Sequence, residues 1–288
     1  WLKYYYPVEF MASLMTSVMD NSTKVSEYTL TCRKMNIEIL PPDINEGEGG
    51  FSVAGNAIRY GLSAIKGVGR PVIETIIAER EANGAFSNLE DFCSRLNGRE
   101  LNKRTIENFI KAGAMDELEG TRKQKIMIYS AILDQINDEK KHSIAGQMSL
   151  FDFADEETKH DFEIQLPDVG EFPKETLLGF EKEVLGVYIS GHPLEEYEEK
   201  WRKNISATTN DFIWDEETGK TKVSDNEKVI VGGMITDKTI KYTKNNKTMA
   251  FLTLEDLLGT VEVIVFPRDY ERYHTYLNVD EKIFVSGH

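Results

Sequence analysis

Cysteine and histidine are scarce in this sequence. Cys32 and Cys93 are the only cysteines among 288 residues, and they do not form a Cys-x-x-Cys pair. A zinc finger needs such a pair, and a disulfide framework needs more cysteines. The five histidines are also far apart along the chain. The sequence therefore excludes a zinc finger, argues against a disulfide framework and predicts that both cysteines are buried thiols.

Long apolar runs and paired aspartates are also missing. No stretch of eighteen apolar residues occurs, and the first residues lack the basic and apolar regions of a secretion signal. No two aspartates form an Asp-x-Asp pair, whereas two-metal phosphoryl chemistry requires clustered carboxylates. We therefore expect a soluble, cytoplasmic chain with no membrane partner and with no catalytic or metal-ligating residues of its own.

Basic charge is limited overall but is concentrated locally. The formal net charge is −15, which argues against a protein that coats nucleic acid with its whole surface. Residues 152–200 contain fifteen acidic and four basic residues, a balance of −11, whereas residues 57–72 contain three basic residues and no acid. A local DNA-binding surface therefore remains allowed.

The first half of the chain has mainly helical periodicity. Apolar spacing predicts one helix over 7–20 and a second from about 21 to 35, followed by a short strand over 37–40. A helical period then extends from Ile58 to about Glu119, with a possible second helical hairpin near 94–113. Further helices are predicted over 103–112, 121–140 and 180–188, and residues 142–170 are predicted to be a linker.

The last sixty residues change in character. Four short segments rich in β-branched and aromatic residues predict strands, with turns near 244–246 and 258–260; these segments are 229–231, 250–254, 261–265 and 282–285. An oligonucleotide-binding (OB) fold needs a fifth strand. We therefore expect a multidomain α+β chain, mostly α-helical at first, that ends in an incomplete β-barrel of the OB type.

The segment Ile58–Pro71 contains a glycine turn between apolar stretches. Lys66, Gly67, Val68, Gly69 and Arg70 form its centre, with an apolar helix expected before it and a new helix after it. Glycines without Cβ atoms allow the backbone to approach a phosphate, and the two cations add charge. The pattern predicts sequence-independent DNA binding. A helical corner that merely uses glycines for its turn is the alternative.

A second candidate site is an apolar patch before an acidic stretch. Gln147, Met148, Ser149, Leu150 and Phe151 compose it. Leu150 and Phe151 could anchor a linear motif in a partner's apolar pocket, with the Gln147 amide at the rim. Local docking of this loop onto its own domain is an equally good interpretation.

A third candidate site lies in the first hairpin of the expected barrel. Its members are cationic or aromatic, as single-strand binding by an OB fold requires; they are Lys238, Lys241, Tyr242, Lys244 and Lys247. Phe251 and Phe266 are further candidates for base stacking. The alternative is a basic hairpin that is simply solvated.

Five separate stretches of the sequence resemble one family. In chain order they are 4–11, 37–45, the glycine turn around 66–69, 185–194 and 249–256. Together they resemble the alpha subunit of bacterial DNA polymerase III, a family C replicative polymerase.

The resemblance implies a C-terminal fragment of that subunit with four regions. These are the end of the fingers (1–50), tandem helix-hairpin-helix DNA binding (51–140), a clamp-binding motif with an acidic connection (141–200) and an incomplete OB fold (201–288). It also implies that residues 147–151 bind the sliding clamp. The implied partners are primer-template duplex, single-stranded template, the clamp and other replisome subunits. The parent's catalytic aspartates, and the Mg²⁺ implied for them, would lie upstream of this fragment.

Two other functional classes compete with this interpretation. A free-standing helix-hairpin-helix DNA repair protein or glycosylase could use Asp91, which follows the glycine turn. A scaffold that binds only proteins is the second. Base excision would identify the first, and failure to bind DNA would identify the second.

Overall fold

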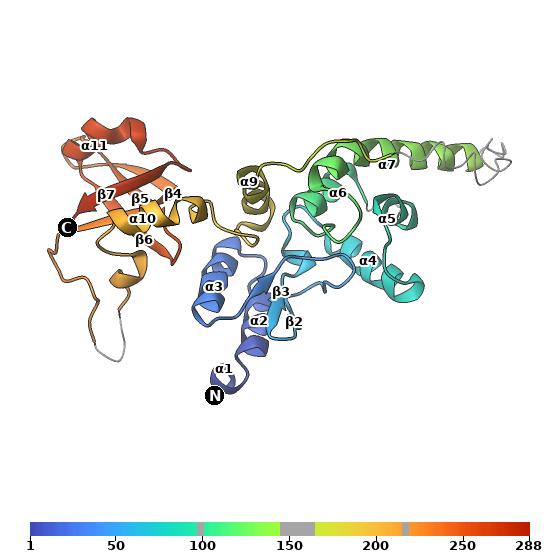
Figure 1. Cartoon of the computed structure of the whole chain (residues 1–288), viewed down its shortest axis with the longest axis horizontal. Coiled ribbons are helices and arrows are strands. Elements are labelled where there is room, and N and C mark those ends of the chain that lie inside the picture. Colours follow the sequence, from blue (N-terminus) through green and yellow to red (C-terminus); the bar gives the residue numbers. More distant parts are fainter. Residues whose placement is uncertain (97–100, 145–164, 215–218) are drawn as a thin grey trace. The chain divides into compact units, whose positions relative to one another are not determined.

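The computed structural model describes residues 1–96, 101–144, 165–214 and 219–288. They form two compact units, Trp1–Ser190 and Gly191–His288 (Figure 1). The first is mainly helical and the second is built on an antiparallel sheet, which confirms the predicted α+β class. Among the described residues, no helix combines the length and apolarity needed to cross a membrane.

The first unit begins with the short helix α1 (Leu2–Tyr5) and the two helices predicted from periodicity, α2 (Pro7–Ser17) and α3 (Ser22–Lys34). Pro7 lies in the first turn of α2, where its missing amide hydrogen costs nothing. The Asn21 side chain accepts a hydrogen bond from the Lys24 amide at 3.1 Å and caps α3. Both predictions are confirmed.

A small three-stranded sheet includes the strand predicted over 37–40 and replaces the start of the predicted helical stretch. Its strands are β1 (Ile39–Leu40), β2 (Ser52–Ala54) and β3 (Ala57–Arg59), in the order β1-β3-β2. The helix expected from Ile58 onward is therefore wrong. The amides of Ile58 and Tyr60 donate to the carbonyls of Glu38 and Leu40 at 2.9 and 3.0 Å, so the backbone is satisfied by a partner strand.

The remaining helices of this unit follow the short 3₁₀ helix η1 (Leu62–Ala64). They are α4 (Arg70–Asn83), α5 (Leu89–Arg95), α6 (Lys103–Lys111), α7 (Arg122–Ile144) and α9 (Lys174–Leu185). The helices predicted over 103–112 and 121–140 are confirmed as α6 and α7. The helix predicted over 180–188 begins earlier and ends earlier, because Gly186 adopts a left-handed conformation with φ +79° and terminates α9.

One apolar core joins the elements of this unit. It includes side chains from Met11 in α2 to Val187 after α9, and the rings of Phe86 and Phe92 lie 5.0 Å apart within it. Cys32 and Cys93 are fully buried and unpaired, as predicted. Burial raises the pKa of the Cys32 thiol to about 11.

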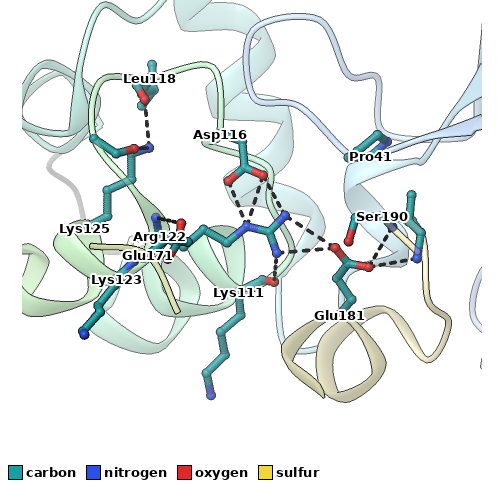
Figure 2. Close-up of polar contacts among 12 residues, drawn as sticks. Pro41, Lys111, Asp116, Leu118, Arg122, Lys123, Lys125, Glu171, Glu181 and Ser190 are labelled. Carbon is teal, nitrogen blue, oxygen red and sulfur yellow. Dashed lines mark hydrogen bonds and ion pairs between the residues drawn. The ribbon is translucent and has the colours of Figure 1, made fainter. Parts of the chain in front are cut away.

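An ion network with a buried Arg122–Glu181 pair connects α7 and α9. Figure 2 shows Arg122, the first residue of α7, between Asp116 and Glu181. Its guanidinium nitrogens lie 2.6 Å from an Asp116 carboxylate oxygen and 3.4 Å from a Glu181 carboxylate oxygen. The other Glu181 oxygen accepts hydrogen bonds from the amides of Ile189 and Ser190 at 2.8 and 3.0 Å. Burial would lower the pKa of Arg122, but hydrogen bonds and the charges of Asp116 and Glu181 raise it overall. The network fixes the end of α9 relative to α6 and α7.

The chain that leads into α9 also attaches to the start of α7. Glu171 accepts hydrogen bonds from the amides of Arg122 and Lys123 at 2.8 and 3.0 Å (Figure 2). A carboxylate is stabilised there because the first amides of a helix lack intrahelical partners. Gln124 donates to the Pro167 carbonyl at 2.8 Å. Residues 165–171 are thereby held against the start of α7.

The second unit contains a curled, four-stranded antiparallel sheet. Its strands are β4 (Val229–Tyr242), β5 (Thr248–Glu255), β6 (Thr260–Val265) and β7 (Lys282–Gly287), in the order β6-β5-β4-β7. All four predicted strands are present, and β4 is much longer than predicted. A register shift between Ile235 and Asp237 marks an irregularity in β4 that favours strand bending. The short helix α11 (Pro267–Tyr273) and the 3₁₀ helix η5 (His274–Tyr276) connect β6 and β7.

The segment before the sheet packs onto it. It contains η3 (Glu195–Tyr197), α10 (Glu198–Asn204) and η4 (Thr209–Phe212). The Trp201 indole donates to the Gly232 carbonyl at 2.6 Å, and a Cβ on Gly232 would lie 2.6 Å from the Phe284 ring. The buried Asp256 carboxylate accepts hydrogen bonds from the amide and hydroxyl of Thr209 at 2.8 and 2.6 Å. These contacts assign an internal structural role to Asp256, in one of the stretches on which the family resemblance rests.

Candidate nucleic-acid interface

The glycine turn lies between η1 and α4. Gly67 adopts φ +76°, a conformation that side chains rarely tolerate, whereas Gly69 has φ −80° and is the N-cap of α4. Pro71 lies in the first turn of α4, and no side chain caps that turn. The expected apolar helix before the turn is reduced to the single 3₁₀ turn η1. The first backbone amides of α4 therefore lie directly after the turn, at a helix start that no side chain caps.

Two elements distant in sequence fix the backbone of this turn. The Lys66 amide donates to the Val184 carbonyl at the end of α9 at 2.8 Å. The Lys66 carbonyl accepts a hydrogen bond from the Asn108 side chain of α6, also at 2.8 Å. A Cβ on Gly67 would lie 2.8 Å from that Asn108 nitrogen. The φ angle therefore favours glycine at 67, and a side chain there would also displace the Asn108 amide from its hydrogen bond with Lys66.

The predicted cations of the turn are exposed. Arg70 is 3.7 Å from Asp20, with side chains 67% and 85% exposed, so this pair contributes little to stability. Lys66 makes no ion pair with any residue that the structure describes. Asp20 lies before α3 and falls outside the acid-free window counted along the sequence. The fold therefore places one acid beside the basic turn.

The second hairpin contributes a cation that sequence reasoning missed. Helices α5 and α6 flank it, Asn102 caps α6 by accepting from the Thr105 amide at 3.0 Å, and residues 97–100 are outside the described part. Arg104, the second residue of α6, is exposed, and its Nε lies 3.8 Å from the position of a Cβ on Gly67. The sequence places Arg104 at the start of a predicted helix, but it does not indicate that this helix start lies next to residue 67.

The five predicted barrel residues do not form one cluster. Lys238 pairs with Leu252 across the sheet and lies 5.7 Å from the Tyr270 ring of α11. Lys241 instead lies 4.4 Å above the ring of Phe251, whose cross-strand partner is Thr239. Because side chains alternate along a strand, Lys238 and Lys241 lie on opposite faces.

The other members of the third site lie at the end of the β4–β5 hairpin. Tyr242 is 72% exposed, and Lys244 and Lys247 are exposed in and beside the turn. Ile264 pairs with Phe251 across β5 and β6 and is exposed on the same face. Phe266, directly after β6, is also exposed. Lys241, Phe251 and Ile264 therefore form an open patch on one face of the sheet.

Two predicted features have no described geometry. Gln147, Met148, Ser149, Leu150 and Phe151 all lie outside the described residues. Within the described ranges, no group of three or more His, Cys, Asp or Glu side chains is placed to hold a metal ion. We therefore assign no ligands to the Mg²⁺ implied for the parent polymerase.

Comparisons with protein families define the class of this chain. Residues 36–125 match a helix-hairpin-helix motif, and residues 229–288 match an OB-fold nucleic acid binding domain. The first match covers the glycine turn, α5 and α6, and the second covers the four-stranded sheet. The chain thus combines two nucleic-acid-binding modules, and the predicted fold class is confirmed.

Curated relatives then identify what the chain is homologous to. DNA polymerase III subunit alpha of Vibrio cholerae is 36% identical over 288 residues, which covers 100% of this chain and 24% of the relative. The corresponding subunits of Deinococcus radiodurans and Escherichia coli K12 are 37% and 33% identical, and the chain covers 21% and 24% of them. The chain is a homologue of part of DNA polymerase III subunit alpha, as the resemblance predicted, and spans about a quarter of these relatives.

The glycine at 67 provides a test of the turn. We expect Gly67→Ala to destabilise the protein by about 1–2 kcal/mol through its positive φ, with a further cost from the contact with Asn108, and to weaken duplex DNA binding. Gly55→Ala is the matched control, because Gly55 also has positive φ (+62°) but has nothing within 4 Å of its Cβ position. Urea unfolding and fluorescence anisotropy with a labelled duplex measure the two effects. Equal DNA affinities for the two variants would contradict the prediction that the turn binds DNA.

Proposed function

We propose that this chain is the DNA-binding and sliding-clamp-tethering part of a bacterial replicative DNA polymerase, which supports template-directed DNA synthesis in the cytoplasm. The observation that carries the proposal is the Gly67 turn with two exposed cations at the uncapped start of α4. Homology to DNA polymerase III subunit alpha along the whole chain supports it. The assignment of residues 1–50 to the end of the fingers and of 141–200 to the clamp-binding connection belongs to the same proposal.

The turn is proposed to bind the primer-template duplex through its phosphates. The first amides of α4 point out of an uncapped helix start, where the helix dipole favours an anion. Lys66 and Arg70 are exposed on either side of Gly67 and can add charge-assisted contacts. Such contacts reach backbone phosphates and not base edges, so binding is independent of sequence and sensitive to salt.

The double variant Lys66→Gln/Arg70→Gln tests duplex binding. We expect a lower affinity and a slope of log K against log salt that is smaller in magnitude by about 1.8. Each phosphate contact contributes about 0.9 to this slope, and the variant loses two. Arg202→Gln/Lys203→Gln removes the same charge from two exposed positions of α10 and serves as control. Anisotropy titrations over a range of KCl concentrations measure both slopes. Identical slopes for the double variant and the wild type would show that Lys66 and Arg70 do not contact DNA phosphates.

The OB fold is proposed to bind single-stranded template. Lys241 and Phe251 offer a cation beside an aromatic face, and Lys244 and Lys247 are exposed at the hairpin end beside it. Tyr242 is exposed at the same end, but it follows Lys241 directly, so strand alternation places it on the other face. Bases stack on such rings while cations attract the backbone, and stacking contributes about 1–3 kcal/mol per base. Lys238 lies on the opposite face against α11, so we leave it out of this surface.

The double variant Lys241→Gln/Phe251→Leu tests the surface on the sheet. We expect about tenfold weaker binding of an oligothymidine strand, since the loss of one stacked base costs about 1–3 kcal/mol. Lys282 of β7 also lies over an aromatic ring, 4.9 Å from that of Tyr197, and pairs with Met234 of β4, away from the β4–β5 turn. Lys282→Gln/Tyr197→Leu is therefore the matched control. If both double variants lose affinity equally, the binding surface is not the one proposed.

The sliding clamp is proposed to bind Gln147, Leu150 and Phe151, with Met148 and Ser149 as spacers. The sequence supports this motif. The described residues that flank it belong to the first unit: α7 precedes it, and residues 165–171, which Gln124 holds against α7 through Pro167, follow it. Apolar anchors in a short linear motif suit capture by a groove on a folded partner.

Replacing Gln147, Leu150 and Phe151 together by Ala tests this motif. We expect loss of binding to the immobilised clamp with unchanged duplex affinity, because none of the three residues belongs to the Lys66–Arg70 turn proposed to bind DNA. Phe162→Ala removes an aromatic residue from the same stretch, outside the motif, and should retain clamp binding. Surface plasmon resonance measures the affinity. A triple variant with wild-type clamp affinity would refute the assignment.

The three attachments act together. Each is individually weak, but linkage on one chain makes each later binding event intramolecular and raises the effective concentration. Polymerisation, its Mg²⁺ and contacts with other replisome subunits belong in this proposal to the whole protein. The chain on its own is expected to incorporate no nucleotide.

The repair-enzyme alternative receives no support from Asp91. Its carboxylate accepts hydrogen bonds from the amide and hydroxyl of Ser87 at 2.9 and 3.2 Å. It also forms an ion pair with Arg95 at 3.3 Å. These contacts give Asp91 a local structural role at the start of α5. A scaffold that binds only proteins is disfavoured by the two nucleic-acid-binding modules.

A further inference from the structure

The start of α6 lies beside the turn of the first hairpin. The Arg104 Nε is 3.8 Å from the position of a Cβ on Gly67. The Asn108 side chain, one helical turn further along α6, donates to the Lys66 carbonyl at 2.8 Å. Residues four apart lie on one face of a helix. One face of α6 therefore presents a cation and an amide to the same five-residue turn.

The charge of Arg104 is available at this position. Arg104 is exposed and forms no ion pair with any residue of the described ranges. Its neighbour Lys103 differs, because its ammonium lies 2.7 Å from both the Ser130 hydroxyl and the Asp134 carboxylate of α7. Adjacent cations on one helix thus have different surroundings. One is partnered by α7, and the other lies beside the turn.

Asn108 fixes the position of α6 relative to the turn. Its side chain is buried, with 8% exposed, and its hydrogen bond ties α6 to the Lys66 backbone. Arg104 therefore extends from a helix whose register relative to Gly67 is set by a buried contact. An exposed cation held in this way loses less conformational freedom when it binds an anion than one on a mobile loop.

We infer that Arg104 binds the same stretch of DNA phosphates as the Lys66–Arg70 turn, so that a helix of the second hairpin completes the phosphate site of the first. This inference rests on the proposed function of the turn. The ligand is the sugar-phosphate backbone of duplex DNA. The planar guanidinium can grip one phosphate with two parallel hydrogen bonds, which a lysine at that position cannot do.

Arg104→Gln and Lys103→Gln in the full chain separate this role from general charge. The two variants lose the same charge at adjacent positions of α6. We expect Arg104→Gln to weaken duplex binding about tenfold at low salt and to flatten the salt slope by about 0.9, the contribution of one phosphate contact. Lys103→Gln should keep the wild-type slope. Arg104→Lys should keep the slope but recover only part of the affinity. Equal behaviour of Arg104→Gln and Lys103→Gln would overturn the inference.

The Lys66→Gln/Arg70→Gln variant, titrated in parallel, tells the two possible failures apart. If it binds duplex DNA with a reduced slope while Arg104→Gln matches the wild type, the turn binds DNA and the role of Arg104 is wrong. If both retain the wild-type slope, the proposed function of the turn fails as well. Reduced slopes in both variants, with Lys103→Gln unchanged, support a shared phosphate site.

Discussion

The backbone of Lys66 is held from two sides, and the candidate DNA interface depends on this constraint. Its amide donates to Val184 at the end of α9, and its carbonyl accepts from Asn108 of α6. Helix α9 is in turn fixed by Glu181, whose carboxylate meets Arg122 and two backbone amides. The five-residue turn is thus held by α6 and α9, and α9 is held by the buried Arg122–Glu181 pair, all of which lie later in the sequence. A preorganised turn can place amides on a phosphate without paying for ordering on binding.

The chain reconciles an acidic composition with a basic interface by placing its charges differently. Arg122 and Glu181 are buried and paired, as buried charges must be. Lys66, Arg70 and Arg104 are exposed around the turn. The net charge of −15 therefore predicts little about local binding, because phosphates respond to nearby cations within about a Debye length, roughly 8 Å at physiological salt.

The sheet of the second unit is shaped by close backbone approach and by strand alternation. Gly232 allows Trp201 and Phe284 to pack against β4, and the Trp201 indole is hydrogen-bonded to the Gly232 carbonyl. Further along β4, alternation separates Lys238 from Lys241. The first faces α11, and the second lies over Phe251 on the open face. A cluster of lysines in sequence is therefore divided between two surfaces.

The sequence by itself determined the helices α2, α3, α6 and α7, the four strands of the second unit and the glycine turn. These features follow from local signals, namely apolar periodicity, capping residues, strand alternation and glycines, which tolerate positive φ. Only the tertiary structure decided that β3 replaces a helix, that Lys238 and Lys241 face opposite ways, and that Arg104 and Asn108 reach Gly67. Lys238 and Lys241 are separated because β4 extends to Tyr242, well beyond the predicted strand over 229–231, so that alternation along one strand applies to both. For β3 and for the turn the deciding partner is distant in sequence: β1 supplies the hydrogen bonds of β3, and α6 meets the turn through packing in a shared core. No local pattern encodes such pairings.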